Sequence, residues 1–222
     1  MIECFFDCSS PWTWLGFRGL RALAVELDEP VHWRPVLVGG IFNAVNPSVY
    51  ASRDNPVPAK AAYLKKDLQD WARASAMHIV FPPTVFPVNS VKAMRACLAL
   101  EPQGLLVEFA EAVFEAYWSH DRDISQDAVL RGIAAQVGAD PDALLQAIRH
   151  PDIKAALKAN TDEVIARGGF GSPTFFVDRD DLYFGNDRLP LIRRAVLARR
   201  EATGIHVKST GRHGTPSDSK GG

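Results

Sequence analysis

The chain has 222 residues, of which 47% are hydrophobic, and its 25 basic side chains nearly balance its 26 acidic ones. Length and composition suit a folded, soluble protein with one large domain or a domain carrying an insertion, and the balanced charge without a dense basic block excludes nucleic acid as an expected partner. No apolar run approaches the ~18 residues of a membrane helix and the start lacks a signal-peptide pattern, so we expect a cytoplasmic protein without membrane contact.

The first part of the chain predicts a β-α-β unit. Its expected elements are a strand over residues 2–6, a helix over residues 10–27 and an alternating strand over residues 31–37. Ser10 before Pro11 is a strong helix start, because proline has no N–H to leave unpaired and the serine oxygen can cap free N–H groups. The connection is long enough for a right-handed crossover between parallel strands, and Pro35 places the second strand at an edge or near its own end.

The middle of the chain is predicted to be helical. Residues 38–58 carry glycine, proline and asparagine without a sustained period, which predicts a long loop. An amphipathic helix over residues 59–76 follows, with Leu64, Leu68 and Trp71 on its inner face, and then a proline-rich segment that excludes a regular helix. Start signals predict further helices beginning near residues 89, 103, 125, 141 and 151.

The last part of the chain returns to strands. Residues 174–177 and 182–184 flank an acidic turn and predict a β-hairpin, after which Asp187 is expected to cap a final helix. The order β-α-β, helical block, β-β-α predicts an α/β fold whose four-stranded mixed sheet has helices on both faces. We therefore expect the following organisation: a discontinuous domain formed by residues 1–37 and 168–204, a loop plus helical insertion over residues 38–167, and a disordered tail over residues 205–222.

The three cysteines predict neither a disulfide framework nor a zinc site, because no Cys-x-x-Cys spacing occurs. Cys4 and Cys8 would lie about 13 Å apart along a strand, too far for a disulfide. Cys97 falls in an apolar helical stretch and is expected in the core. For Cys8, two residues before the helix start, a reactive thiol and a packed interior side chain are both open. The histidines lack metal-ligand spacing, so no metal is expected.

Several motifs together carry a family resemblance. Ser10-Pro11-Trp12-Thr13 stands where thioredoxin-fold oxidoreductases keep Cys-Pro-x-Cys, and Gly171-Ser172-Pro173-Thr174 resembles their cis-proline loop. The chain resembles the 2-hydroxychromene-2-carboxylate isomerases and the related kappa-class glutathione transferases, which share a DsbA-like thioredoxin fold with a helical insertion. The matching segments are residues 10–17, 39–42, 86–90 and 184–189.

The resemblance implies glutathione as cofactor and a homodimer. Because Ser10 and Thr13 replace both cysteines, thiol–disulfide exchange lacks its attacking and resolving thiols, and the sulfur must come from outside. Ser10 would donate its hydroxyl to the glutathione thiolate, while the helix N-terminus lowers the thiol pKa. The remaining cofactor contacts that the resemblance implies are the backbone of Ser172 for the cysteinyl group, and Gly185, Asn186 and Asp187 for the γ-glutamyl end.

The activity that the resemblance implies is the cis-trans isomerisation of an aromatic chromene-type carboxylate. Glutathione would add to the substrate, the ring would open, a bond would rotate and the thiol would leave. The candidate substrate-binding residues are Asn43, Asn46, Asn89 and Lys60, the last as a carboxylate partner. Asn89 and Asp187 could each be a plain helix cap instead. Two other functions stay open: a kappa-type transferase or peroxidase, and a non-catalytic binding protein that kept the fold.

Overall fold

The structure, a computed structural model, describes residues 1–204 and contains one mixed sheet. Its strands are β1 (Ile2–Phe6), β2 (Val31–Pro35), β3 (Thr174–Val177) and β4 (Asp181–Phe184). They follow the spatial order β2-β1-β3-β4, with β1 parallel to β2 and antiparallel to β3, and with β3 antiparallel to β4. The predicted four-stranded mixed sheet, parallel crossover and hairpin are confirmed, and β2 lies at an edge as Pro35 indicated.

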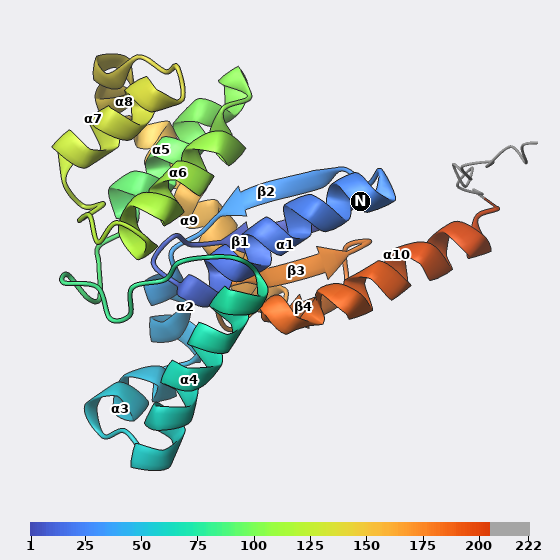
Figure 1. The fold of residues 1–222 in the computed structure, drawn as a ribbon. Coiled ribbons are helices and arrows are strands. Elements are labelled where there is room, and N and C mark those ends of the chain that lie inside the picture. Colours follow the sequence, from blue (N-terminus) through green and yellow to red (C-terminus); the bar gives the residue numbers. More distant parts are fainter. Residues whose placement is uncertain (205–222) are drawn as a thin grey trace, which may run out of the picture.

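Helices cover both faces of this sheet (Figure 1). In chain order they are α1 (Pro11–Leu27), α2 (Val38–Val45), α3 (Ser48–Asp54), α4 (Pro58–Ala74), α5 (Val91–Leu100), η1 (Glu101–Gln103), α6 (Leu106–Trp118), α7 (Asp127–Gln136), α8 (Pro141–Ala147), α9 (Pro151–Ala166), η2 (Asn186–Arg188) and α10 (Leu189–Ala202). Cys4 and Phe6 of β1 belong to the large core shared with α1, α10 and the helices α5 to α8. Phe5 points to the other face, where it packs with Ile41 of α2 and Val164 of α9.

The prediction of a long loop over residues 38–58 is wrong, because α2 and α3 occupy this segment. The start of α2 has no capping side chain next to it in the sequence. Instead, a carboxylate oxygen of Asp7 accepts the N–H of Val38 at 2.8 Å, and the hydroxyl of Thr161 accepts the N–H of Leu37 at 3.0 Å. Tertiary contacts from distant parts of the chain therefore supply the capping that the local sequence lacks.

The expected inner face of α4 is only partly correct. Leu68 and Ala72 are buried, but Leu64 and Trp71 remain 44% and 37% exposed. Figure 1 explains the difference, since α3 and α4 project away from the sheet and from the helices α5 to α8. Only one end of α4 reaches the body of the protein, and the rest of its apolar side chains stay accessible.

Two predicted helix caps are also wrong. Ser125 does not cap α7, whose N-cap is Gln126; the N–H of Ser125 instead donates to the carboxylate of Asp123 at 2.9 Å. Asp187 does not cap α10, because η2 intervenes and α10 begins only at Leu189. Two other start signals are confirmed: Asp140 caps α8 and His150 caps α9 through their side chains. The helix predicted to begin near residue 103 begins at Leu106, after η1.

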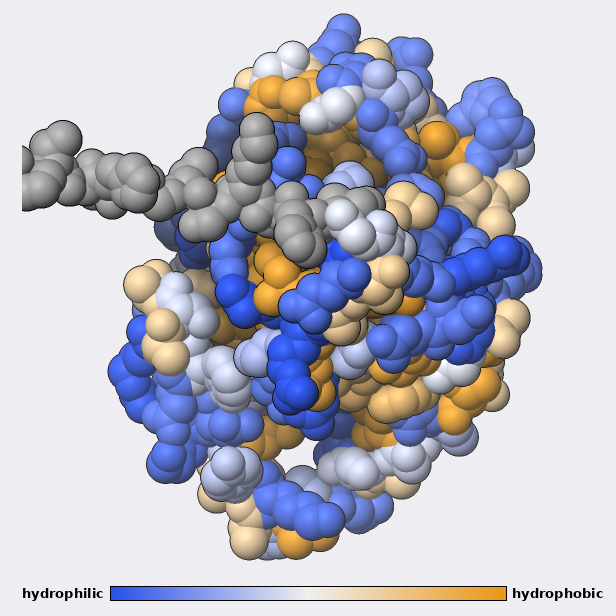
Figure 2. Space-filling model, turned by 90° about the vertical axis from the view of Figure 1, so that its right-hand side faces the viewer, coloured by the Kyte–Doolittle hydropathy of each residue, from blue (hydrophilic) through white to orange (hydrophobic). Residues whose placement is uncertain are grey.

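No helix within residues 1–204 has the length and apolarity needed to cross a bilayer. On the face shown in Figure 2, hydrophobic residues form separate patches among hydrophilic ones. The predicted tail over residues 205–222 lies outside the described residues. The division into a discontinuous domain and an insertion stays a prediction.

A buried carboxylate ties α10 to the strand ends. Glu29, which follows α1, pairs with Arg199 at 2.6 Å, with Arg200 at 2.8 Å and with the amino group of Met1 at 2.8 Å. Burial opposes its ionisation, but the hydrogen bonds from Arg199, the amino group and Arg200 outweigh that effect and lower the pKa of Glu29 to about 2. The ionised side chain therefore stabilises the folded state.

We expect Glu29→Gln to lower the free energy of unfolding at pH 7 by about 2–3 kcal/mol, because two arginines lose their buried partner. The pKa is lower in the folded state than its usual value of 4.5, so this stabilisation is present above pH 4.5 and disappears as the pH falls toward 2. Urea unfolding at pH 7, 4 and 3 measures it. As a control, Glu26→Gln removes an exposed pair with Arg193 and should change stability by less than about 1 kcal/mol. A gap between wild type and Glu29→Gln that is constant with pH would contradict the assignment.

Candidate active site

Ser10 lies at the junction between β1 and α1. It is the N-cap of α1 and half-buried, and its Oγ accepts the backbone N–H of Thr13 at 3.3 Å. Pro11 has no N–H, and the N–H of Trp12 has no protein acceptor within residues 1–204. Free N–H groups and the positive end of the helix dipole favour an anion at this place. The predicted helix start is confirmed, and it leaves the Ser10 hydroxyl at the mouth of α1.

The loop before β3 packs against the first turns of α1. Its Ser172–Pro173 peptide bond is cis, and a Cβ on Gly16 would lie 2.9 Å from the Pro173 ring, so only glycine permits this close approach. The hydroxyl of Ser172 lies 2.9 Å from that of Thr13. The backbone N–H and C=O of Ser172 have no hydrogen-bond partner in the described part of the chain. The loop therefore presents an unpaired donor and acceptor beside the start of α1.

Asp7 is a buried carboxylate beneath this junction that the sequence analysis missed. One of its oxygens accepts the N–H of Ser9 at 2.9 Å, and the other accepts the N–H of Val38 at 2.8 Å. Burial raises the pKa of Asp7, while the hydrogen bonds from Ser9, Val38 and the Ser90 hydroxyl act in the opposite direction. Its backbone N–H donates to the Ser172 hydroxyl at 3.0 Å. The sequence signal that could have identified Asp7 is a charged residue placed between an apolar strand and a helix start.

The three residues predicted for the γ-glutamyl end lie together near the cis-proline loop. Gly185 has a φ of 101°, which favours glycine, and its N–H donates to the carbonyl of Pro173 at 3.2 Å. Asn186 is buried, and its Nδ2 has no hydrogen-bond partner among residues 1–204. The Asp187 side chain is exposed and pairs with Arg188 at 2.6 Å. This end of the sheet therefore offers a buried, unpaired amide donor and an accessible carboxylate.

The four candidate substrate-binding residues are not gathered at one point. Asn46 donates to the carbonyl of Phe170 at 3.1 Å and so contacts the segment before the cis-proline loop. Asn43 is exposed on α2. Asn89 accepts the N–H of Val91, the first residue of α5, at 3.1 Å, but the N-cap of this helix is Ser90, so the alternative of a plain N-cap is wrong for Asn89.

Lys60 lines a cavity between α4 and the start of α1. The cavity has a volume of about 440 Å³, and its lining residues are Trp12, Ala59, Lys60, Tyr63, Leu64 and Asp67. Because Trp12 is the second residue of α1, the cavity lies next to the Ser10 junction. Of the four candidates, Lys60 is therefore the one placed in a hollow beside the helix mouth.

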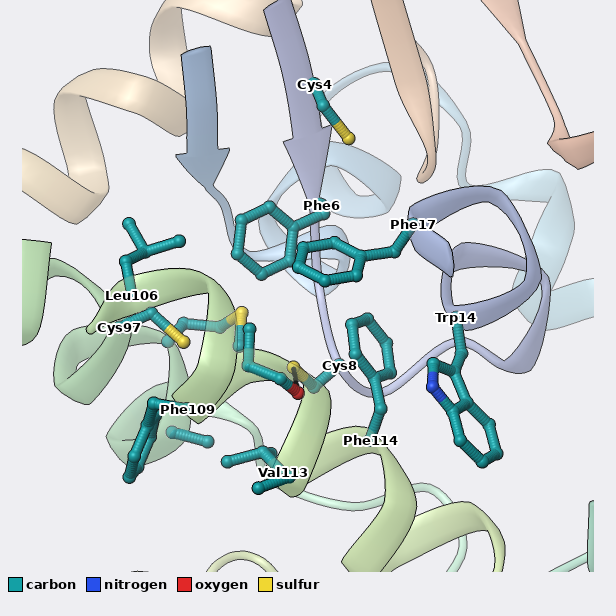
Figure 3. Close-up of a cluster of buried hydrophobic side chains, with 14 of the residues drawn as sticks. Cys4, Phe6, Cys8, Trp14, Phe17, Cys97, Leu106, Phe109, Val113 and Phe114 are labelled. Atoms are coloured by element: carbon teal, nitrogen blue, oxygen red, sulfur yellow. Dashed lines mark hydrogen bonds between the residues drawn. The ribbon is translucent and has the colours of Figure 1, made fainter. Parts of the chain in front are cut away.

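All three cysteines lie in the interior, which decides between a reactive thiol and a packed side chain for Cys8. Cys4, Cys8 and Cys97 are all free and buried, and Figure 3 shows them among aromatic and aliphatic side chains of the core. Burial raises the pKa of the Cys8 thiol well above its usual value, and the neighbouring Cys97 raises it further. The carbonyl of Cys8 accepts the indole N–H of Trp118 at 2.9 Å. Cys8 is an interior side chain and supplies no thiolate beside Ser10.

The mixed sheet, the helices inserted between β2 and β3, and the cis-proline loop against the first helix define a protein of the thioredoxin fold. Hydroxyl groups stand where redox members of this class carry thiols. The family model described as DSBA-like thioredoxin domain matches residues 1–197. The chain belongs to this family.

Two relatives match over most of their length. The chain is 29% identical over 198 residues to 2-hydroxychromene-2-carboxylate isomerase of Sphingobium xenophagum, which covers 88% of this chain and 97% of the relative. It is 28% identical over 206 residues to glutathione S-transferase kappa 1 of Homo sapiens, which covers 86% and 88% respectively. The family resemblance inferred from the motifs is confirmed.

Solved structures show the same fold. A structure of 2-hydroxychromene-2-carboxylate isomerase superposes with a TM-score of 0.78 at 22% identity, covering 93% of this chain and 99% of the other. The cytosolic disulfide reductase DsbM from Pseudomonas aeruginosa, solved with GSH, has a TM-score of 0.62 at 20% identity, covering 90% and 98%. The predicted DsbA-like thioredoxin fold is confirmed.

Proposed function

We propose that this protein is a glutathione-dependent isomerase that acts on an aromatic chromene-type carboxylate. The observation that carries the proposal is the half-buried Ser10 hydroxyl at the open N-terminus of α1, where neither Ser10 nor Thr13 offers a thiol. Such a site suits a thiolate brought by a second molecule. The relatives named as isomerases and kappa transferases, which match along most of the chain, support an enzyme that acts on small molecules.

The described residues fit glutathione at three points. Ser10 and the free N–H of Trp12 suit its thiolate. The unpaired backbone N–H and C=O of Ser172 can pair with its peptide groups as an added strand would. The buried, unpaired amide of Asn186 suits its α-carboxylate, and the exposed carboxylate of Asp187 suits its amine.

Each of these residues has a defined task in the proposed reaction. The Ser10 oxygen accepts the Thr13 N–H, so its own proton is free to donate to a thiolate. The hydroxyl pair of Thr13 and Ser172 holds the cis-proline loop against α1. Glutathione, when bound, supplies a thiol that adds reversibly to the substrate and permits rotation about a bond. Lys60, in its cavity beside Trp12, and Asn43 and Asn46, on α2 and at its end, are proposed as polar contacts to the substrate.

Kappa-type transfer or peroxide reduction is the second candidate, supported by the similarity to the human kappa transferase. It requires the same stabilised thiolate but consumes it. A non-catalytic binding protein is the third. A homodimer is part of the proposal and is measured by light scattering.

The deciding experiment follows 2-hydroxychromene-2-carboxylate with catalytic glutathione. We expect the substrate absorbance to change while the thiol concentration stays constant. Consumption of glutathione with a generic electrophile, and no isomerisation, would favour the transferase. Glutathione at about ten times its Kd should stabilise the fold by about 1.4 kcal/mol, which a thermal shift detects. No shift at millimolar glutathione would remove the cofactor from the proposal and favour the binding protein.

A further inference from the structure

Arg53 of α3 lies between two aromatic rings that come from separate segments. Its guanidinium carbon is 5.8 Å from the ring centre of Phe42 in α2 and 5.9 Å from that of Phe86 in the proline-rich segment. Both distances fall within the ~6 Å reach of a cation–π contact. Within residues 1–204, Arg53 has neither a carboxylate partner nor a hydrogen-bond acceptor. The rings fix the position of the guanidinium and leave its N–H donors available.

Each of the two rings contacts a residue next to a segment of the candidate site. On one side, Phe42 would lie 3.7 Å from a Cβ on Gly171, the residue before Ser172. On the other side, Phe86 packs on Trp118 with ring centres 6.4 Å apart. The indole of Trp118 donates to the carbonyl of Cys8, two residues before Ser10. Arg53 therefore lies between a ring beside the cis-proline loop and a ring that packs on Trp118, whose indole is bonded to the turn before Ser10.

Other arginines of the described chain that lie over aromatic rings are already neutralised. Arg34 and Arg167 contact the ring of Phe5, but both pair with the carboxylate of Glu3. Arg53 has the same aromatic support without the acid, and Phe86 is 38% exposed. A guanidinium supported on its faces keeps its in-plane N–H groups directed outward, the geometry that binds a carboxylate through two hydrogen bonds.

Lys60 is less suited to select an anion. The cavity that it lines also carries Asp67, whose carboxylate offsets the positive charge of the lysine. Arg53 has no acid of this kind against it within residues 1–204, and its neighbours are the rings of Phe42 and Phe86.

We propose that Arg53, held between Phe42 and Phe86, binds the carboxylate of an aromatic acid and so determines the preference for anionic aromatic substrates. The aromatic part of the ligand contacts the partly exposed ring of Phe86. The role of Arg53 in substrate preference during turnover rests on the proposed isomerase function. Its binding of an aromatic carboxylate rests on the geometry around Arg53 alone.

The kinetic test compares Arg53→Met with Arg53→Lys and with Arg194→Met, an exposed arginine on α10. We expect Arg53→Met to raise KM for 2-hydroxychromene-2-carboxylate at least about tenfold, because a charge-assisted pair is lost. KM for glutathione and the thermal shift by glutathione should not change. For Arg53→Lys, which keeps the charge but not the paired N–H donors of the guanidinium, KM for the substrate should lie between those of wild type and Arg53→Met. Arg194→Met should have the wild-type KM. A raised KM for glutathione instead would place Arg53 at the cofactor and overturn the proposal.

A binding test works without turnover. Quenching of tryptophan fluorescence by 2-naphthoate and by the neutral 2-naphthamide gives two dissociation constants for each variant. We expect wild-type protein to bind the acid at least about tenfold more tightly than the amide, and Arg53→Met to lose this preference. An unchanged preference in Arg53→Met would overturn the proposal. A preference that depends on Arg53 in a protein that does not isomerise would support Arg53 while the proposed reaction fails.

Discussion

Ser10→Ala is expected to lower kcat of the proposed isomerisation about a hundredfold, because a positioned hydroxyl donor to the developing anionic sulfur is lost. The same substitution removes the side-chain cap of α1, where the Ser10 oxygen accepts the Thr13 N–H. Loss of an N-cap costs about 1 kcal/mol, which lowers Tm by about 2–4 °C in a chain of this size. Steady-state kinetics and a thermal melt measure the two effects separately.

Ser10→Gly is the matched control for these two roles. Glycine at an N-cap loses only a few tenths of a kcal/mol, so this variant should keep nearly the wild-type Tm and still lose most turnover. Ser10→Thr keeps the hydroxyl and should retain much of the wild-type turnover and thermal stability. Without the donor, the thiol pKa rises, so the pH–rate profiles of Ser10→Ala and Ser10→Gly should move to higher pH. Wild-type turnover in Ser10→Gly would contradict the role assigned to the hydroxyl.

Local signals in the sequence account for the elements that were predicted correctly. The start of α1 depends on Ser10 and Pro11, and the β3–β4 hairpin depends on residues next to each other in the chain. α2 was missed because the carboxylate that accepts its first backbone N–H is Asp7, 31 residues earlier in the chain. The start of α3 has no capping side chain. Asp187 has a local pattern suited to a cap, but η2 intervenes and shifts the start of α10.

The candidate site was predicted as far as its residues lie in recognisable motifs. Thr13 and Ser172 are 159 positions apart in the sequence, so only the resemblance to a known fold could bring them together before the structure did. Arg53 was missed for a related reason. Its position depends on Phe42 and Phe86, which belong to two other segments, and an arginine in a segment predicted as a loop carries no signal of its own.

Asp7→Ala is expected to destabilise the fold and impair the site together. The substitution leaves three donors without their acceptor in a buried place: the N–H groups of Ser9 and Val38 and the hydroxyl of Ser90. Unsatisfied buried donors of this kind lower the free energy of unfolding by about 2–4 kcal/mol in total. The start of α2 then loses its connection to the turn before Ser10. Misplacement of catalytic groups by about 1 Å can cost a hundredfold in rate, so kcat should fall toward that extent.

The control is Asp180→Ala, which removes an exposed acid from the turn between β3 and β4 and should change stability by less than about 0.5 kcal/mol. The pH dependence has the opposite sign to that of Glu29. Burial raises the pKa of Asp7 above its usual value of 3.8, so the folded state holds this proton more tightly than the unfolded chain. The contribution of Asp7 to stability therefore decreases as the pH rises through its pKa in the folded state. The difference in free energy of unfolding between wild type and Asp7→Ala should widen from pH 7 toward pH 4. Urea unfolding of both proteins at several pH values measures this gap. A gap that narrows on acidification would contradict the raised pKa and show that the hydrogen bonds to the Asp7 carboxylate outweigh the effect of burial.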